Sequence, residues 1–181
     1  APTFQWQIST NGGVSFTDLV HGAPYSGVTT TTLALTGVTA GLTGNQYRAI
    51  ATNSSGGATS TPATLTVASP PTFTTQPANQ TVAAGANGSF TVAVTATPAA
   101  TFQWQVSTNG GVSFANLANG APYSGVTTTT LTITSATAGL TGNQYRAVAT
   151  NPGGSVNSHA ATLTVTTAPA ITTQPTNQTV T

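Results

Sequence analysis

The 181-residue sequence is nearly devoid of charge: it has two arginines, Arg48 and Arg146, one acidic residue, Asp18, and no lysine. Proteins that bind nucleic acid or anionic membranes use clusters of basic side chains, so a formal net charge of +1 argues against both kinds of partner. Acid–base catalysis also needs ionisable side chains beside the reacting atoms. The composition therefore predicts a protein that is not an enzyme and carries no cofactor.

Cysteine and methionine are absent as well. The lack of cysteine excludes disulfides, but it does not decide the compartment, because it fits a cytosolic protein and an exported one equally well. No stretch approaches the run of about 18 apolar residues that a membrane helix needs, and Ala1 does not begin a signal peptide. We expect no membrane insertion in this stretch and place any export signal outside it.

The chain is rich in β-branched and small polar residues, including 42 threonines. Disordered chains are poor in β-branched and aromatic residues, so a hydrophobic content of 38% with many such residues predicts a folded, all-β protein. The abundance of threonine, serine, asparagine and glycine, together with the lack of charge, favours a secreted protein at an extracellular, bacterial cell-surface location.

The chain repeats itself at an offset of 98 residues, without a gap, and 58 of the 83 aligned pairs are identical. A period of this length indicates a tandem array of small domains. It predicts a first repeat at residues 1–68 that lacks its first two strands, a complete repeat at 69–167, and the first strand of a following repeat at 168–181.

The most informative stretch is residues 101–111, which recurs almost unchanged at residues 3–13. Phe102, Trp104 and Val106 alternate with glutamines, the period-2 pattern of a half-buried strand, and an Asn-Gly-Gly turn follows. Further short strands are expected at 72–75, 81–82, 90–96, 112–117, 128–134, 144–150 and 156–165. Short strands separated by turn residues predict a sandwich of two sheets.

The sequence pattern of the complete repeat resembles that of the intermediate-set immunoglobulin domain. The resemblance rests on the order and spacing of Val92, Trp104, Leu131 and the Tyr145-Arg146-Ala147 segment. They resemble more closely the bacterial immunoglobulin-like repeats that stand in tandem in large secreted and surface proteins. The resemblance implies tandem immunoglobulin-like β-sandwiches, with one complete and two partial copies. The side chains that it assigns to the core are Trp6, Tyr47, Val92, Phe102, Trp104, Leu131, Tyr145 and Ala147.

The resemblance also has two local implications. Many members of the family join their sheets by a disulfide, and Val92 and Ala147 occupy those two positions here. Tyr145 stands two residues before the second position, which matches the tyrosine corner of the family, in which the hydroxyl bonds to backbone across the corner.

Few side chains in the sequence are chemically reactive. His21 lies near Asp18, but the aligned residues are Asn119 and Asn116, so we interpret the pair as a solvated loop pair rather than a catalytic or metal site. His159 is expected at the surface. Hard cations such as calcium need several carboxylates, and the chain has one, so no metal is expected.

Two groups of side chains, the tyrosines and the threonine runs, each allow more than one interpretation of their role. Tyr25 and Tyr123 either pack under a loop or form a contact surface, whereas the two tryptophans favour the core over a sugar-binding platform. The threonine runs at 29–32 and 127–130 fit either a polar strand edge or O-glycosylation, and four short Asn-x-Ser/Thr motifs fit N-glycosylation.

Two functions are compatible with these observations. The first is a structural or adhesive extracellular fibre or stalk that assembles head to tail, with neighbouring repeats or subunits as its partners. In one version of it, residues 168–181, with Ile171 and Val180 as apolar anchors, donate an edge strand to the next subunit. The alternative is an accessory module of a larger secreted protein or hydrolase that binds a glycan or a surface receptor.

Overall fold

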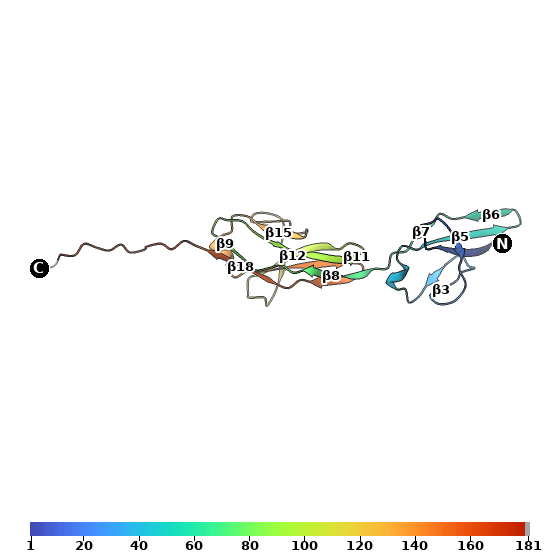
Figure 1. Cartoon of the computed structure of the whole chain (residues 1–181), viewed down its shortest axis with the longest axis horizontal. Coiled ribbons are helices and arrows are strands. Elements are labelled where there is room, and N and C mark those ends of the chain that lie inside the picture. The colour runs from blue at the N-terminus through green and yellow to red at the C-terminus, as the bar shows by residue number, and fades with distance from the viewer. Residues whose placement is uncertain (180–181) are drawn as a thin grey trace. The chain divides into compact units, whose positions relative to one another are not determined.

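A computed structural model describes residues 1–179 of the chain (Figure 1). The chain divides into two compact units. Unit 1 comprises residues 1–71, 96–99 and 151–154, and unit 2 comprises the remaining residues. Strands predominate in both units, and the helical turns are two short 3-10 segments, which confirms the all-β prediction.

Unit 1 is built around the pairing of its first and fifth strands. Its sheet has the order β2-β1-β5-β6, with β7 also pairing to β5, and β3 pairs with β4 in a separate two-stranded sheet. The elements are β1 (Thr3–Ser9), β2 (Thr17–Asp18), β3 (Tyr25–Ser26), β4 (Ala34–Leu35), η1 (Ala40–Leu42), β5 (Gln46–Asn53), β6 (Gly56–Thr59) and β7 (Ala63–Thr64).

Unit 2 repeats this arrangement and adds strands before it. Its larger sheet has the order β13-β12-β16-β18-β9, with β17 on β16; a second sheet has the order β10-β15-β14, and β8 pairs with β11. The elements are β8 (Ser69–Thr75), β9 (Gln80–Ala83), β10 (Gly88–Thr91), β11 (Ala93–Thr97), β12 (Thr101–Ser107), β13 (Ala115–Asn116), β14 (Tyr123–Ser124), β15 (Thr130–Ile133), η2 (Ala138–Leu140), β16 (Gln144–Asn151), β17 (Gly154–Asn157) and β18 (Ala161–Thr166).

The strand with the alternating pattern, β12, lies inside the larger sheet, between β13 and β16. It pairs antiparallel with β16, with Trp104 opposite Ala147 and Gln105 opposite Arg146. Since successive side chains point to opposite faces, Trp104 is directed into the core and Gln105 toward solvent. The small Ala147 leaves room for the indole ring beside it.

A hydrogen-bonded turn ends β12. The buried Ser107 hydroxyl accepts from the backbone N–H of Gly111 at 2.9 Å and donates to Asn109 Oδ1 at 2.8 Å. The same Asn109 oxygen accepts from the N–H of Ser113 at 3.0 Å. This is the local side-chain-to-backbone bonding that favours serine and asparagine in turns, and it fixes where the chain reverses toward β13.

The core of unit 2 lies between its two sheets. Phe90 and Leu131 from the smaller sheet meet Trp104, Tyr145 and Leu163 from the larger one. The Phe90 ring stacks on Tyr145 with 5.0 Å between ring centroids and lies 6.4 Å from the ring of Trp104. Burial of several aromatic and branched side chains at once supplies the hydrophobic stabilisation of this unit.

The core of unit 1 is smaller. Its buried members are Leu19, Val28 and Tyr47, and Trp6 is only partly buried against them. Within the described residues, unit 1 has no counterpart of β9 and β10. The strands that would adjoin them are accordingly shorter: β4 and β7 each have two residues, whereas the equivalent β15 has four and β18 has six.

Several strand boundaries differ from the sequence prediction. The strand expected at 90–96 is interrupted at Val92, because β10 pairs with β15 while β11 pairs with β8. The strand expected at 156–165 is divided at residues 158–160, and the one expected at 112–117 is reduced to β13. None of the helical segments in residues 1–179 has the length and apolar character to cross a membrane.

Candidate functional site

A side-chain ladder on the outer face of the larger sheet contains the charged group of unit 2. The guanidinium of Arg146 lies over the ring of Phe114, 4.0 Å from its centroid, and its Nε donates to Gln105 Oε1 at 2.8 Å. Gln105 Nε2 in turn donates to Asn116 Oδ1 at 2.8 Å. The ladder runs from β16 across β12 to β13 and joins three neighbouring strands through their side chains.

Unit 1 carries the same ladder with one chemical difference. Arg48 lies 3.9 Å from the ring centroid of Phe16 and donates to Gln7, and Gln7 donates to Asp18 Oδ1 at 2.7 Å. All three charged side chains of the chain therefore belong to the two ladders. Each arginine Nε is bonded to a neutral amide, and a cation over an aromatic ring contributes about 0.5–1 kcal/mol at an exposed site.

Sequence reasoning missed the ladder, although a signal for it was present. Gln105 and Arg146 occupy outward positions of strands whose inward residues are apolar, and both recur at an offset of 98 residues. Their mutual contact depends on the register of β12 against β16, which the sequence pattern does not specify.

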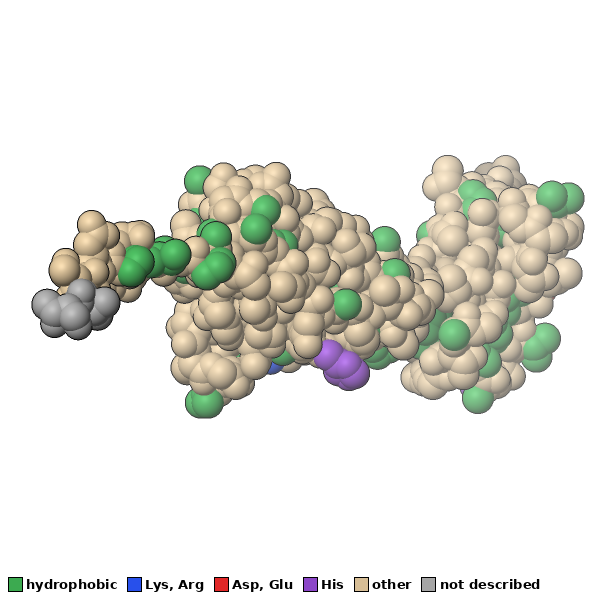
Figure 2. All heavy atoms as spheres, turned by 60° about the vertical axis from the view of Figure 1, so that its left-hand side comes forward, with side chains coloured by type: hydrophobic (Ala, Val, Ile, Leu, Met, Phe, Trp, Pro, Cys, Tyr) green, Lys and Arg blue, Asp and Glu red, His purple; other side chains and the backbone are tan. Residues whose placement is uncertain are grey.

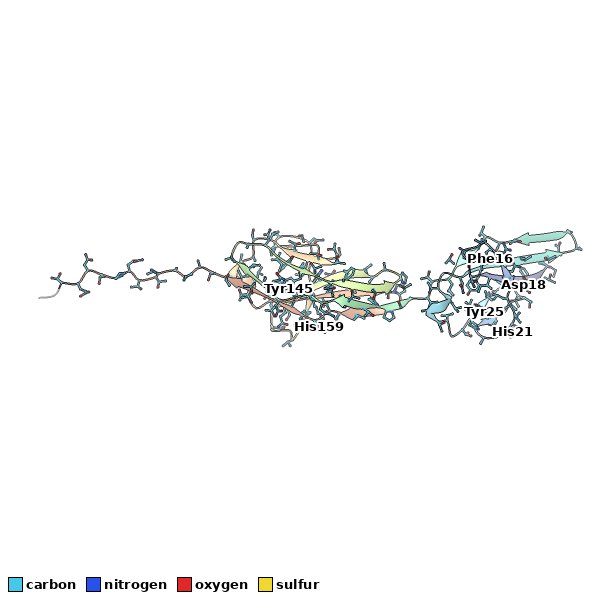
Figure 3. The ribbon with its side chains drawn as sticks, in the orientation of Figure 1. Phe16, Asp18, His21, Tyr25, Tyr145 and His159 are labelled. Carbon is cyan, nitrogen blue, oxygen red and sulfur yellow. The ribbon has the colours of Figure 1, made fainter. Side chains whose placement is uncertain are left out.

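Two tyrosines meet inside each unit. The hydroxyls of Tyr123 and Tyr145 are 3.3 Å apart in unit 2, and those of Tyr25 and Tyr47 are 3.4 Å apart in unit 1. The expected tyrosine corner is therefore different here: the Tyr145 hydroxyl pairs with a second phenol instead of with backbone across the corner. Figure 3 shows Tyr145 among the strands of unit 2.

Burial is the main influence on these phenols. It raises the pKa of Tyr145 well above its ordinary value, and the hydrogen bond with Tyr123 adds to the effect. Burial, followed by the hydrogen bond with Tyr47, raises the pKa of Tyr25 to about 12. Both phenols thus stay protonated at neutral pH, so they act as packing and hydrogen-bonding groups and not as bases.

The two tyrosines proposed as a contact surface, Tyr25 and Tyr123, are half-buried against the hydrophobic clusters of their units. Trp104 is fully buried, and its indole N–H donates to the carbonyl of Thr128 at 3.0 Å. Trp6 makes the equivalent bond to Thr30 at 3.0 Å. The threonine runs are thus mainly turns that receive the indoles, and not strand edges; only Thr130 lies in a strand.

The remaining predicted core residues lie in unit 2. Val92, Leu131 and Ala147 are buried members of its core cluster, so an apolar pair stands at the positions where the resemblance implies a disulfide. Phe102 is partly buried against the same cluster.

Ionisable groups do not gather into a reactive cluster. Asp18 and His21 are both exposed, and the Asp18 carboxylate accepts from Gln7 (Figure 3). His159 is exposed, and its backbone N–H donates to Gln76 Oε1 at 2.8 Å. Among residues 1–179 there is no group of three histidine, cysteine, aspartate or glutamate side chains that could hold a metal ion.

Equivalent hollows occur in the two units beside Pro24 and Pro122. The one in unit 2 has a volume of about 470 Å³ and the one in unit 1 about 420 Å³. Neutral residues line the larger one: Ala121, Pro122, Thr134, Ser135, Thr137 and Leu140. This lining contains no carboxylate, imidazole, amine or thiol group.

The segment proposed as a strand donor follows β18. Residues 167–179 carry no strand, and Ile171 is 76% exposed. Val180, its second proposed anchor, lies outside the described residues. The assignment of residues 168–181 as the first strand of a following repeat therefore stays a prediction.

The surface of the molecule is mostly neutral and polar on the face drawn in Figure 2. Figure 2 shows a face on which backbone and neutral polar side chains predominate and hydrophobic side chains are scattered between them. The most exposed large hydrophobic side chains of the described residues include Val14 and Val112, which occupy equivalent turns of the two units. Scattered single apolar residues of this kind are ordinary at protein surfaces.

Comparison with known proteins places these features in a family. The sequence profile of the immunoglobulin I-set domain matches residues 71–165, more than half of the chain. Endoglucanase C of Cellulomonas fimi is 42% identical over 104 residues, which cover 58% of this chain and 9% of that enzyme. The chain thus corresponds to a small part of the enzyme's length.

Solved structures with a similar fold contain several such domains in one chain. The N-terminal four immunoglobulin domains of Dscam1 isoform 4.44 match 91% of this chain and 38% of that chain, with a TM-score of 0.54 and 22% identity. Extracellular domains 3–5 of Drosophila OTK match 91% of this chain and 52% of that chain, with a TM-score of 0.53 and 18% identity.

At such low identity these two matches establish the fold alone. Together with the profile, they confirm the predicted resemblance and the predicted fold class of tandem immunoglobulin-like sandwiches. The chain belongs to the immunoglobulin I-set domain family.

Proposed function

We propose that the chain is a non-catalytic stalk segment of a larger extracellular bacterial protein, in which immunoglobulin-like repeats serve as structural spacers. The observation that carries the proposal is the repetition of surface geometry between the units. The arginine ladder, the Asn-Gly-Gly turn, the tryptophan-binding threonine turn and the hollow beside the proline all recur.

Repetition of this kind favours a spacer over a receptor-binding module. A recognition surface is expected to differ between domains where it meets its ligand, whereas a spacer needs only a stable fold. The polar side chains of the ladders are also engaged within the fold, because their glutamine and arginine side chains bond to one another. A surface almost without charge further favours contact between neutral fibres.

Electron microscopy of the purified native protein tests this proposal. We expect thin rods or filaments with a regular spacing along them, as successive repeats would produce. Short segments attached to a large globular body would contradict the stalk and support an accessory module.

The identity with Endoglucanase C favours that accessory role as a second candidate. In this candidate the repeats belong to a secreted hydrolase and either separate its domains or bind its glucan substrate. Affinity electrophoresis through gels that contain soluble β-glucans separates the two possibilities. Retardation of the chain, abolished by a free oligosaccharide, would establish binding, and unchanged mobility would leave spacing as the role.

A further inference from the structure

The hollows beside Pro24 and Pro122 are large enough to hold a small ligand. In unit 2 the hollow has a volume of about 470 Å³ and lies between Pro122, the turn after β15, and η2. Its equivalent in unit 1 has a volume of about 420 Å³. Both volumes fall within the range of about 300–1,000 Å³ that is typical of small-molecule sites.

The lining of the hollow in unit 2 is amphipathic. Its half-buried residues, Pro122 and Leu140, are apolar. Its exposed residues include Ser135 and Thr137, which carry hydroxyls. A ligand that enters this hollow therefore meets apolar groups in the less exposed part and hydroxyls in the more exposed part.

The fold leaves both of these hydroxyls without a partner. Thr137 stands at the N-cap position of η2, where a threonine hydroxyl ordinarily accepts from a backbone N–H. No such bond forms there, and none forms at the equivalent Thr39 of unit 1. The backbone N–H of Ser135 donates to Asn87 Oδ1 at 3.0 Å, but within residues 1–179 its hydroxyl has no hydrogen-bond partner. Both hydroxyls are thus available to a ligand.

The backbone of Ser135 is also unusual. Its φ is 50°, and among the described residues it is the one non-glycine residue with a positive φ. The equivalent residue of unit 1 is Gly37, with a φ of 64°. Glycine adopts this conformation freely, whereas a residue with a Cβ does so at an energetic cost. Strained residues of this kind cluster at functional sites, and here the strained residue supplies a hydroxyl to the hollow.

We propose that these hollows bind the pyranose units of a neutral polysaccharide. A pyranose ring has a face of C–H groups and a periphery of hydroxyls. In unit 2 the C–H face contacts Pro122 and Leu140, and the hydroxyls bond to Ser135 and Thr137. The lining contains no ionised side chain, so a charged ligand would lose water there without gaining a counter-charge, whereas a neutral sugar does not incur that cost.

A polymeric ligand accounts for the recurrence of the hollow. A polysaccharide presents the same sugar many times, so each unit of the chain can meet it with the same lining. The proposal goes beyond the spacer role, which requires no ligand, and it does not depend on that role. Since the lining has no aromatic ring on which a sugar could stack, binding at a single hollow is expected to be weak.

Nuclear magnetic resonance of the isotope-labelled full chain tests the proposal. The chain is titrated with cellohexaose and, separately, with maltohexaose, which contain the same neutral glucose unit in two different linkages. We expect the amide signals of Ser135 and Leu140 in unit 2, and of Gly37 and Leu42 in unit 1, to shift until they saturate with at least one of the two. A preference between the hexasaccharides would identify the linkage that the hollows accept.

Thr137→Val is the matched variant, because it replaces one hydroxyl by a methyl group of similar size. The extended backbone of Thr137, with a φ of −94° and a ψ of 156°, suits a β-branched residue, so the fold should be retained. Loss of one hydrogen bond should weaken binding in unit 2 about three- to tenfold and leave the titration of Gly37 and Leu42 unchanged. Thr39→Val should have the opposite effect. Thr164→Val, at an exposed position of β18 outside the lining, should alter neither.

Three results would overturn the proposal. The first is the absence of saturable shifts with both hexasaccharides, and the second is a set of shifts confined to residues outside the two hollows. The third is unchanged binding in unit 2 of the Thr137→Val chain. A stalk established by electron microscopy would survive any of them, because a spacer needs no ligand.

Discussion

The phenol pair of unit 2 shows how burial alters a single residue. Tyr145 has no measurable exposure, and its hydroxyl pairs with the hydroxyl of Tyr123. An ordinary tyrosine ionises near pH 10, and in the unfolded chain Tyr145 does so as well. The raised pKa in the folded state means that folding favours the protonated phenol.

The unfolding free energy of unit 2 is therefore expected to decrease at alkaline pH. Below about pH 10 both states hold the Tyr145 proton, so this group gives the unfolding free energy of unit 2 no pH dependence. Above that pH the unfolded chain releases the proton first, so the unfolding free energy falls as pH rises toward the folded pKa. Urea denaturation between about pH 8 and pH 11 measures the slope.

Tyr145→Phe is the matched variant for this prediction. It should unfold more easily at neutral pH, because Tyr123 loses its hydroxyl partner, yet show a smaller decrease in stability at alkaline pH. An identical alkaline slope in the variant would assign the effect to other tyrosines.

Two turn glycines, Gly110 and Gly125, allow the effect of backbone strain to be distinguished from that of steric collision. Gly110, in the turn after β12, has a φ of 72° and open space where a Cβ would stand. Gly125, after β14, has a φ of 73°, but a Cβ there would collide with the carbonyl oxygen of Thr130. The two sites share a backbone conformation and differ in their surroundings.

The alanine variants should therefore differ in stability. Gly110→Ala is expected to cost about 1 kcal/mol, the cost of placing a side chain in the left-handed region. Gly125→Ala should cost about 3 kcal/mol, since the backbone near Thr130 must also move. Denaturant unfolding of both variants measures the difference, and equal losses would mean that the loop relaxes freely around the new methyl group.

The strands show what the sequence could and could not predict. The alternation of apolar and polar residues around Trp104 was sufficient to predict β12, because successive side chains of a pleated strand point to opposite faces. It was insufficient at Val92, where apolar residues continue but the chain leaves β15 and joins β8. The partner of the Tyr145 hydroxyl and the contact of Arg146 with Phe114 depend on cross-strand neighbours, which local pattern does not specify.

Within the molecule, unit 1 is expected to be less stable than unit 2. Phe90 stacks on Tyr145 and lies near Trp104, and loss of such a buried ring costs about 3–5 kcal/mol. The described part of unit 1 has no equivalent ring over Trp6 and Tyr47. Unit 1 should therefore unfold first, in a separate transition.

Single-tryptophan variants test this difference. In Trp6→Phe the emission comes from the fully buried Trp104, and in Trp104→Phe it comes from the partly buried Trp6. We expect redder emission, stronger quenching by acrylamide and a lower denaturant midpoint for Trp6. Coincident transitions for the two reporters would show that the units unfold together.

The arginine ladders also determine how the chain meets a protease. Trypsin cleaves after lysine and arginine, and the only such residues are Arg48 and Arg146. Each lies in the interior of a long strand with its guanidinium over a phenylalanine ring, so neither peptide bond can enter a protease cleft until that strand separates. The molecule therefore carries one concealed cleavage site in each unit, and a tryptic digest reports which unit has opened.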